Sequence, residues 1–209
     1  MRAGPDGTTS PGMISIHTHS PEETQQVGRI MGEEARPGDI YLLTGPLGAG
    51  KTCLTQGIAW GLRVLQHARS PTFVLMTRYQ GRLTLYHFDL YRIGGPLEAW
   101  DLGVEEQLEG DGVCVVEWAD QAEEIFPEHA LWVRLDYAAA GGEGEKSSQP
   151  PFLKGGPVIK GESAGIAAGA AEPVRQENRR TITFGRHSSR YDALLVRLSR
   201  ELPAAQDCP

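Results

Sequence analysis

The feature that most constrains the fold is a glycine-rich stretch that fits the pattern GxxxxGK(S/T) without a mismatch. A short apolar run, 39–44, precedes it, and a segment without helix breakers until Gly57 follows it. A strand, such a loop and a helix in this order are the context that a phosphate-binding loop requires. We therefore predict an α/β fold, a P-loop NTPase-like three-layer sandwich. The stretch consists of Gly45, Pro46, Leu47, Gly48, Ala49, Gly50, Lys51 and Thr52.

The residue types in this loop suit a nucleoside polyphosphate. Glycines let the backbone wrap closely round phosphates, and backbone N–H groups together with a helix N-terminus supply partial positive charge. In loops of this kind the lysine, here Lys51, reaches the β and γ phosphates, and the hydroxyl of Thr52 binds Mg²⁺. A plain glycine turn with a surface lysine would not explain a Lys-Thr pair at this offset. We expect ATP or ADP and Mg²⁺ as ligands.

Length and composition narrow the class of protein further. A chain of 209 residues with 40% apolar content can bury one sizeable core. A net charge of −7 argues against a nucleic-acid site on this chain alone, because such sites carry a basic footprint. The three cysteines form no CxxC pair, and no apolar run approaches the ~18 residues of a membrane span. We expect a cytoplasmic protein without membrane contact.

The composition divides the chain into segments. Residues 1–12 are rich in Gly, Pro, Thr and Ser and predict a disordered tail. Residues 13–137 are predicted to form a P-loop ATPase domain, and 181–201 to add a closing strand and helix to it. Between them, 138–180 is too rich in Gly, Ala and Pro, and too long, for an ordered loop. We predict a mostly disordered insert that joins two edge elements, and a second tail over 202–209.

Local signals place the elements of the main domain. A strand-like run opens at Met13, which is also a candidate start of translation, and Ser20-Pro21 with Glu23 predicts a capped helix after it. A short turn at residues 80–82 between two strand-like runs predicts a hairpin, so the sheet is mixed. Residues 113–118 are apolar on both faces, which is typical of a central buried strand.

Two acids come at the ends of predicted strands, where α/β sheets place their ligands. Glu117 stands where an acid would complete a Mg²⁺ site; alternatively it faces solvent or caps the next helix. Asp89 is the last inward residue of its strand; the alternative is a turn-forming role before Tyr91. Thr24, near a helix start, suits a structural role as well as a nucleotide contact.

Four further residues are weaker candidates. Ser70 and Thr72 follow the loop helix, where nucleotide switches often carry hydroxyls that touch the metal or the γ-phosphate. His87 is interpreted as a packed strand residue rather than an acid-base catalyst. Cys53 sits at a helix N-terminus, where a thiol pKa can fall, but a packed small side chain is the better interpretation.

Taken together, GPLGAGKT, SPTF, YHFDLYR and VEW, in this order and spacing, resemble the TsaE (YjeE) family of bacterial P-loop ATPases. Those proteins act in making the threonylcarbamoyl modification on adenosine 37 of tRNAs. The resemblance implies that Thr52 and Glu117 hold Mg²⁺ and that Lys51 and the loop amides bind the phosphates. It further implies that Asp89 is needed for hydrolysis and that Thr24 lies near the nucleotide.

The resemblance also implies partners. Proteins of this family associate with a TsaB–TsaD pair that transfers the threonylcarbamoyl group, so tRNA is reached through the complex, in agreement with the acidic net charge. Hydrolysis of ATP by the subunit alone is expected to be weak. Two alternatives from other classes stay open: a P-loop small-molecule kinase, although no arginine-bearing lid is evident between 53 and 135, and a nucleotide-switched binding module that hydrolyses little.

Overall fold

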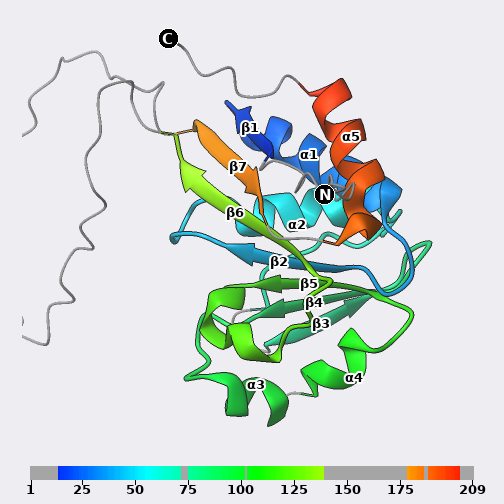
Figure 1. Ribbon diagram of the computed structural model, residues 1–209, viewed down its shortest axis with the longest axis vertical. Helices are drawn as coiled ribbons and strands as arrows, with labels where there is room; N and C mark the ends of the chain where they lie inside the picture. Colours follow the sequence, from blue (N-terminus) through cyan, green and yellow to red (C-terminus); the bar gives the residue numbers. More distant parts are fainter. Residues whose placement is uncertain (1–13, 72–74, 102, 139–177, 186–187, 203–209) are drawn as a thin grey trace, which may run out of the picture. The chain divides into compact units, whose positions relative to one another are not determined.

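The computed structural model describes residues 14–71, 75–101, 103–138, 178–185 and 188–202. The predicted tail 1–12, almost all of the predicted insert, residues 203–209 and Thr72 lie outside these ranges. Figure 1 shows the described fold.

A seven-stranded mixed sheet, in the order β1-β7-β6-β2-β5-β4-β3, forms the middle layer (Figure 1). The strands β4, β5, β2 and β6 run parallel, and β3, β7 and β1 add antiparallel pairings. The mixed sheet and the predicted hairpin are thereby confirmed. The strand bounds are β1 (Ile14–Thr18), β2 (Ile40–Thr44), β3 (Met76–Tyr79), β4 (Leu85–Asp89), β5 (Val113–Glu117), β6 (Leu131–Tyr137) and β7 (Arg180–Phe184).

The strand order corrects one expectation. The segment after β6 was predicted to join two edge elements, but β7 lies between β6 and β1, so the edges of the sheet are β1 and β3. The prediction is wrong because β1, from the start of the domain, pairs along the free side of β7 and covers it.

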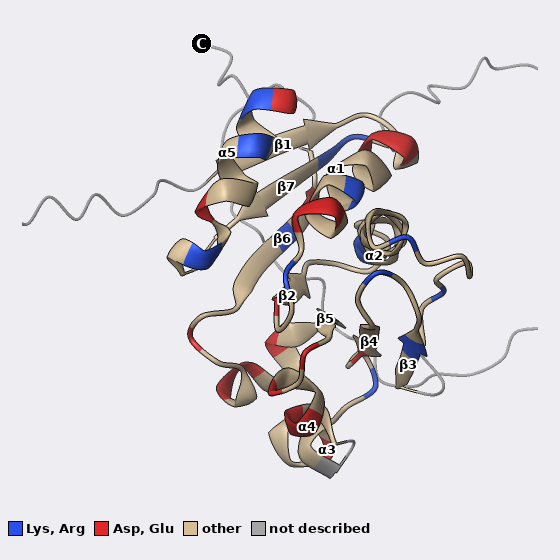
Figure 2. Cartoon of the chain, turned by 90° about the vertical axis from the view of Figure 1, so that its right-hand side faces the viewer, with Lys and Arg blue, Asp and Glu red and all other residues tan. Residues whose placement is uncertain are grey.

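Helices cover both faces of the sheet, which gives the predicted three layers. One apolar core lies under α1, α2 and α5, and a second lies under α3, α4 and the short helix η1. In Figure 1, α1, α2 and α5 lie above β2 and beside β1, β7 and β6, and α3 and α4 lie below β3, as they also do in Figure 2. The helix bounds are α1 (Pro21–Glu34), α2 (Lys51–Gly61), α3 (Pro96–Asp101), α4 (Val104–Leu108), η1 (Ala119–Ile125), η2 (Ser189–Tyr191) and α5 (Asp192–Glu201).

The two helices nearest the loop pack backbone against backbone. Glycines recur at a spacing of four residues in both, as Gly28 and Gly32 in α1 and Gly57 and Gly61 in α2. A Cβ atom at Gly32 would lie 2.2 Å from the carbonyl oxygen of Ile58, and the other three positions are equally tight. The missing side chains let α1 approach α2 closely, and this contact fixes the helix that follows the phosphate-binding loop.

The start of α1 agrees with the predicted cap. The Ser20 hydroxyl accepts a hydrogen bond from the backbone N–H of Glu23 at 3.2 Å. The Glu23 carboxylate in turn accepts one from the backbone N–H of His19 at 2.7 Å, one residue earlier than in the usual capping box.

The sheet brings the two predicted acids together. In the parallel pair β4 and β5, Asp89 is the register partner of Glu117, so both carboxyl groups leave the sheet at the same edge. The loop after β2, the neighbour of β5, opens at that edge as well. Among the described residues, no helix is both long and apolar enough to cross a membrane.

Candidate active site

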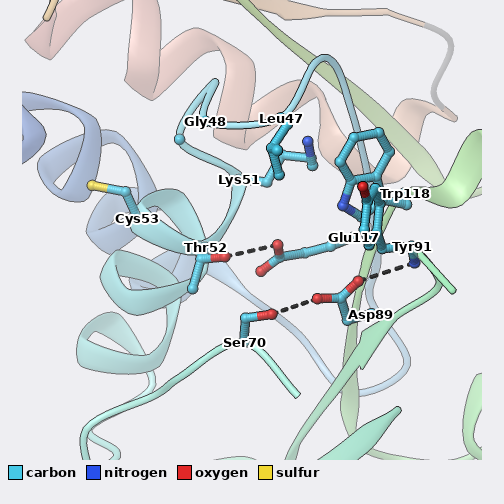
Figure 3. A pocket seen from close by; sticks show the side chains of 11 residues that line it. Leu47, Gly48, Lys51, Thr52, Cys53, Ser70, Asp89, Tyr91, Glu117 and Trp118 are labelled. Carbon is cyan, nitrogen blue, oxygen red and sulfur yellow. Dashed lines mark hydrogen bonds between the residues drawn. The ribbon is translucent and has the colours of Figure 1, made fainter. Parts of the chain in front are cut away.

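A cavity of about 370 Å³ lies at the carboxyl edge of β2, β4 and β5 (Figure 3). The predicted loop, both predicted acids and the Ser70 side chain line it. Two aromatic side chains, Tyr91 and Trp118, whose ring centroids are 4.8 Å apart, form one wall. The full lining is Leu47, Gly48, Gly50, Lys51, Thr52, Cys53, Ser70, Asp89, Tyr91, Glu117 and Trp118.

The loop has the backbone conformation that its glycines were expected to supply. Gly45, Gly48 and Gly50 have φ angles of 125°, 76° and 105°, a region that favours glycine. Gly50 is the N-cap of α2 and has no side chain to satisfy the first N–H groups of that helix. Those N–H groups are therefore available to an anion placed at the helix N-terminus.

Lys51 is almost fully buried, with 5% of its surface exposed. Its ammonium group donates hydrogen bonds to the carbonyl oxygens of Gly45, at 2.6 Å, and Pro46, at 2.9 Å, and lies 3.7 Å from the centroid of the Trp118 ring. Burial lowers the pKa of Lys51, and the negative charges of Glu117, Asp120 and Asp89 oppose this shift. The loop thus holds a poorly hydrated cation beside the cavity.

Glu117 is buried and faces the cavity, so the alternative that it faces solvent is wrong. One carboxylate oxygen accepts a hydrogen bond from the Thr52 hydroxyl at 2.8 Å. The other accepts one from the Thr55 hydroxyl at 3.2 Å and lies 2.8 Å from Nε2 of His87. Hence the structure brings Thr52 and Glu117 together, as the predicted metal site requires (Figure 3).

His87 is fully buried in β4, in agreement with the interpretation as a packed strand residue. Its contact with Glu117 was missed by sequence reasoning, although the alternation of β4 places His87 and Asp89 on one face. Nδ1 of His87 has no hydrogen-bond partner in the described part of the chain. The ring therefore makes its one polar contact with the carboxylate of Glu117.

Asp89 is also buried, and it both makes a turn contact and lines the cavity. One carboxylate oxygen accepts from the backbone N–H of Tyr91 at 3.0 Å, the contact of a turn-forming aspartate. The other accepts a hydrogen bond from the Ser70 hydroxyl. At the same time Asp89 lines the cavity, and Figure 3 shows it facing the same space as Glu117.

Thr24 lies on the opposite side of the loop. Its hydroxyl bonds to the Thr18 hydroxyl at 2.8 Å and to the Ser20 carbonyl at 3.2 Å. It lines a smaller cavity of about 170 Å³ that also includes Gly48 and Gly50. Thr24 is thus adjacent to the loop, and its hydroxyl stabilises the start of α1 through its hydrogen bonds to Thr18 and Ser20.

The donor set suits Mg²⁺ bound together with a nucleotide. Among the described residues, no three His, Cys, Asp or Glu side chains gather as a metal site. Mg²⁺ at phosphate sites needs only one or two oxygen ligands from the protein, because phosphates and water complete its shell. A hydroxyl and a carboxylate 2.8 Å apart, beside a phosphate-binding loop, fit this requirement.

The fold and this site define a P-loop NTPase-like protein: a phosphate-binding loop between β2 and α2, and acids on neighbouring parallel strands at the same edge. A family model confirms the closer resemblance. The model described as "Threonylcarbamoyl adenosine biosynthesis protein TsaE" matches residues 18–145, and the chain belongs to this family. The family takes part in tRNA threonylcarbamoyladenosine biosynthesis.

Individual relatives agree with this assignment. The tRNA threonylcarbamoyladenosine biosynthesis protein TsaE of Bacillus subtilis is 44% identical over 126 residues, which are 60% of this chain and 78% of the relative. The protein of the same name from Treponema pallidum is 39% identical over 124 residues, 59% of this chain and 92% of the relative. The crystal structure of Bacillus subtilis YdiB is similar with a TM-score of 0.63 and 30% identity, covering 90% of this chain and 95% of that one.

Proposed function

We propose that this protein is a Mg²⁺-dependent ATPase subunit of the machinery that makes threonylcarbamoyladenosine at position 37 of tRNA. The observation that carries the proposal is the contact between Thr52 and Glu117, 2.8 Å apart, with Asp89 at the adjoining strand end. This arrangement supplies oxygen ligands for one metal ion and a second carboxylate beside the phosphate-binding loop.

Each group has a role in phosphoryl transfer to water. The loop N–H groups and Lys51 bind the phosphates, and Thr52 and Glu117 hold the Mg²⁺ ion. When bound, the ion neutralises charge that develops on the phosphate oxygens. His87 and Thr55 keep the carboxylate of Glu117 turned toward Thr52 through the contacts described above.

Asp89 is the candidate group for orienting the attacking water. Its carboxylate is held by the Ser70 hydroxyl and by the Tyr91 N–H, so its direction is fixed before a nucleotide arrives. A fixed carboxylate near the terminal phosphate accepts a hydrogen bond from water and aligns it for attack. Thr24, on the other side of the loop, is proposed to lie near the nucleotide.

The proposed partners are inferred from the family to which the chain belongs and from the net charge of the chain. We propose that the chain works with a TsaB-like and TsaD-like pair and that this pair holds the tRNA. The support is the net charge of −7, which opposes direct binding of a polyanion by this chain.

Phosphate release from ATP, measured with and without a purified TsaB–TsaD-like pair, tests the proposal. We expect slow release by the chain alone and faster release with the pair, without any small-molecule acceptor. Phosphate transfer only when an acceptor is added would indicate a kinase. Tight ATP binding without release in either condition would indicate a nucleotide-switched binding module.

A further inference from the structure

One side chain outside the phosphate-binding loop holds the tip of that loop. Tyr137, the last residue of β6, donates its phenol O–H to the carbonyl oxygen of Leu47 at 2.8 Å. Arg180, its register partner in β7, lies with its guanidinium carbon 4.4 Å from the centroid of the Tyr137 ring. The same guanidinium donates to the carbonyl oxygen of Gly48 at 3.3 Å. Two consecutive carbonyl groups of the loop are thus held from the end of the sheet.

The loop is shaped to receive this tyrosine. A Cβ atom at Gly48 would lie 2.7 Å from the Tyr137 hydroxyl, and the φ angle of Gly48 is 76°. A Cβ atom at Gly45 would lie 2.0 Å from the carbonyl oxygen of Leu135, in the same strand. Both glycines therefore let the loop lie directly against the end of β6, in addition to permitting its backbone conformation.

This contact has a consequence for the loop's N–H groups. The peptide unit that joins Leu47 to Gly48 is planar, so fixing the direction of its carbonyl also fixes the direction of the Gly48 N–H. Because the loop binds anions through its N–H groups, the Tyr137 hydroxyl sets one of the donors before a ligand arrives.

We infer that Tyr137 is a positioning residue for nucleotide binding: its hydroxyl holds the Leu47–Gly48 peptide in the orientation that receives the phosphates. This inference rests on the proposed function, because it requires a polyphosphate in the loop. Tyr137 is 50% exposed, so water can solvate its hydroxyl in the absence of the contact, and the fold depends little on it. Loss of the hydroxyl is therefore expected to weaken ligand binding rather than to destabilise the fold.

Tyr137→Phe in the full chain tests the inference, with Tyr86→Phe as the matched control. Tyr86 is a half-buried tyrosine of β4 that packs against the core under α3, α4 and η1, and its ring faces Arg78. Binding of ADP with Mg²⁺ and of AMP is measured by calorimetry, together with thermal unfolding without nucleotide. We expect Tyr137→Phe to weaken ADP binding about three- to tenfold. AMP binding, which depends less on the loop, and the unfolding temperature should change little, and Tyr86→Phe should match the wild type.

A double-mutant cycle with Gly48→Ala distinguishes loss of the contact between Tyr137 and the loop from general damage to the loop. The added methyl group meets the Tyr137 hydroxyl in the wild type, whereas in the Tyr137→Phe background only the backbone strain at Gly48 remains. We expect Gly48→Ala to reduce ADP affinity by a smaller factor in that background.

The outcomes distinguish this inference from the proposed function. A wild-type chain that binds no ADP overturns both. If the wild type binds ADP and Tyr137→Phe binds it equally well, only the inference is overturned. Equal weakening of ADP and AMP with a lower unfolding temperature makes the hydroxyl merely structural, and additive effects in the cycle also contradict the inference.

Discussion

The exchange Glu117→Gln removes a negative charge from the site with almost no change of shape. Glu117 is 2% exposed, and its carboxylate is held by Thr52, Thr55 and His87. If Glu117 has a purely structural role, these hydrogen bonds alone explain why an acidic residue stands at this position. In a metal site the negative charge itself is needed. The exchange separates the two because Gln keeps the size and much of the hydrogen bonding.

The effect on stability without metal is the difference of two opposing contributions. Hydrogen bonds to a charged group are worth about 1.5–3 kcal/mol, compared with about 1 kcal/mol for neutral ones, so Gln loses part of this stabilisation. Burying an ion costs several kcal/mol, and Gln avoids that cost. Because the contributions are similar in size, we expect the free energy of unfolding without Mg²⁺ to change by no more than about 2 kcal/mol.

The effect on metal binding has no such compensation. Unit charges about 4 Å apart attract by about 4 kcal/mol at an effective dielectric constant of 20. Dehydration of Mg²⁺ offsets much of this attraction. We therefore expect at least a tenfold rise, about 1.4 kcal/mol, in the Mg²⁺ concentration that gives half-maximal ADP binding.

The assay is a Mg²⁺ titration of ADP binding, combined with urea unfolding in the absence of metal. Glu124→Gln, at an exposed glutamate of η1, is the control for a change of net charge. An unchanged Mg²⁺ requirement in Glu117→Gln would place the metal ligand elsewhere. A loss of stability above about 3 kcal/mol with a normal Mg²⁺ requirement would make Glu117 structural.

Three further predictions follow from particular contacts. Lys51→Ala should weaken ADP binding at least about tenfold, whereas Asp89→Ala should bind normally but release no phosphate; equal loss of binding in calorimetry would contradict these roles. Gly32→Ala places a Cβ atom 2.2 Å from the Ile58 carbonyl oxygen and should lower the free energy of unfolding by about 1–3 kcal/mol; unchanged urea unfolding would show that α1 and α2 separate easily. Burial is the main cause that raises the pKa of Cys53 to about 11. The rate of alkylation of Cys53, monitored by peptide mass spectrometry, should therefore rise about tenfold per pH unit from pH 8 toward that value. A rate that levels off below pH 9 would refute the shift.

The parts of the site built from neighbouring residues were predictable from the sequence. The strand, loop and helix around Lys51 follow from glycine spacing and apolar runs, and the hairpin follows from its turn. The apolar run of β5 also placed Glu117 at a buried strand end, and alternation placed Asp89 facing inward. In each case the signal lies within about ten residues of the side chain concerned.

The contacts between distant elements were beyond local patterns. The partner of His87 lies on β5, and the partner of Tyr137 lies in the loop after β2, so neither pairing leaves a periodicity in the sequence. The same reason explains the wrong expectation about the sheet edge, because the pairing of β1 with β7 joins residues near opposite ends of the chain. The pKa of Cys53 depends on burial against α1 rather than on its place at a helix N-terminus.

The most direct test of the proposed mechanism is a crystal structure with a non-hydrolysable ATP analogue and Mg²⁺. We predict the Thr52 hydroxyl about 2.1 Å from the ion, the carboxylate of Glu117 bound to it directly or through one water, and Asp89 hydrogen-bonded to a water that faces the γ-phosphate. Carboxyl groups of Glu117 and Asp89 that point away from the ion and the γ-phosphate would contradict the mechanism.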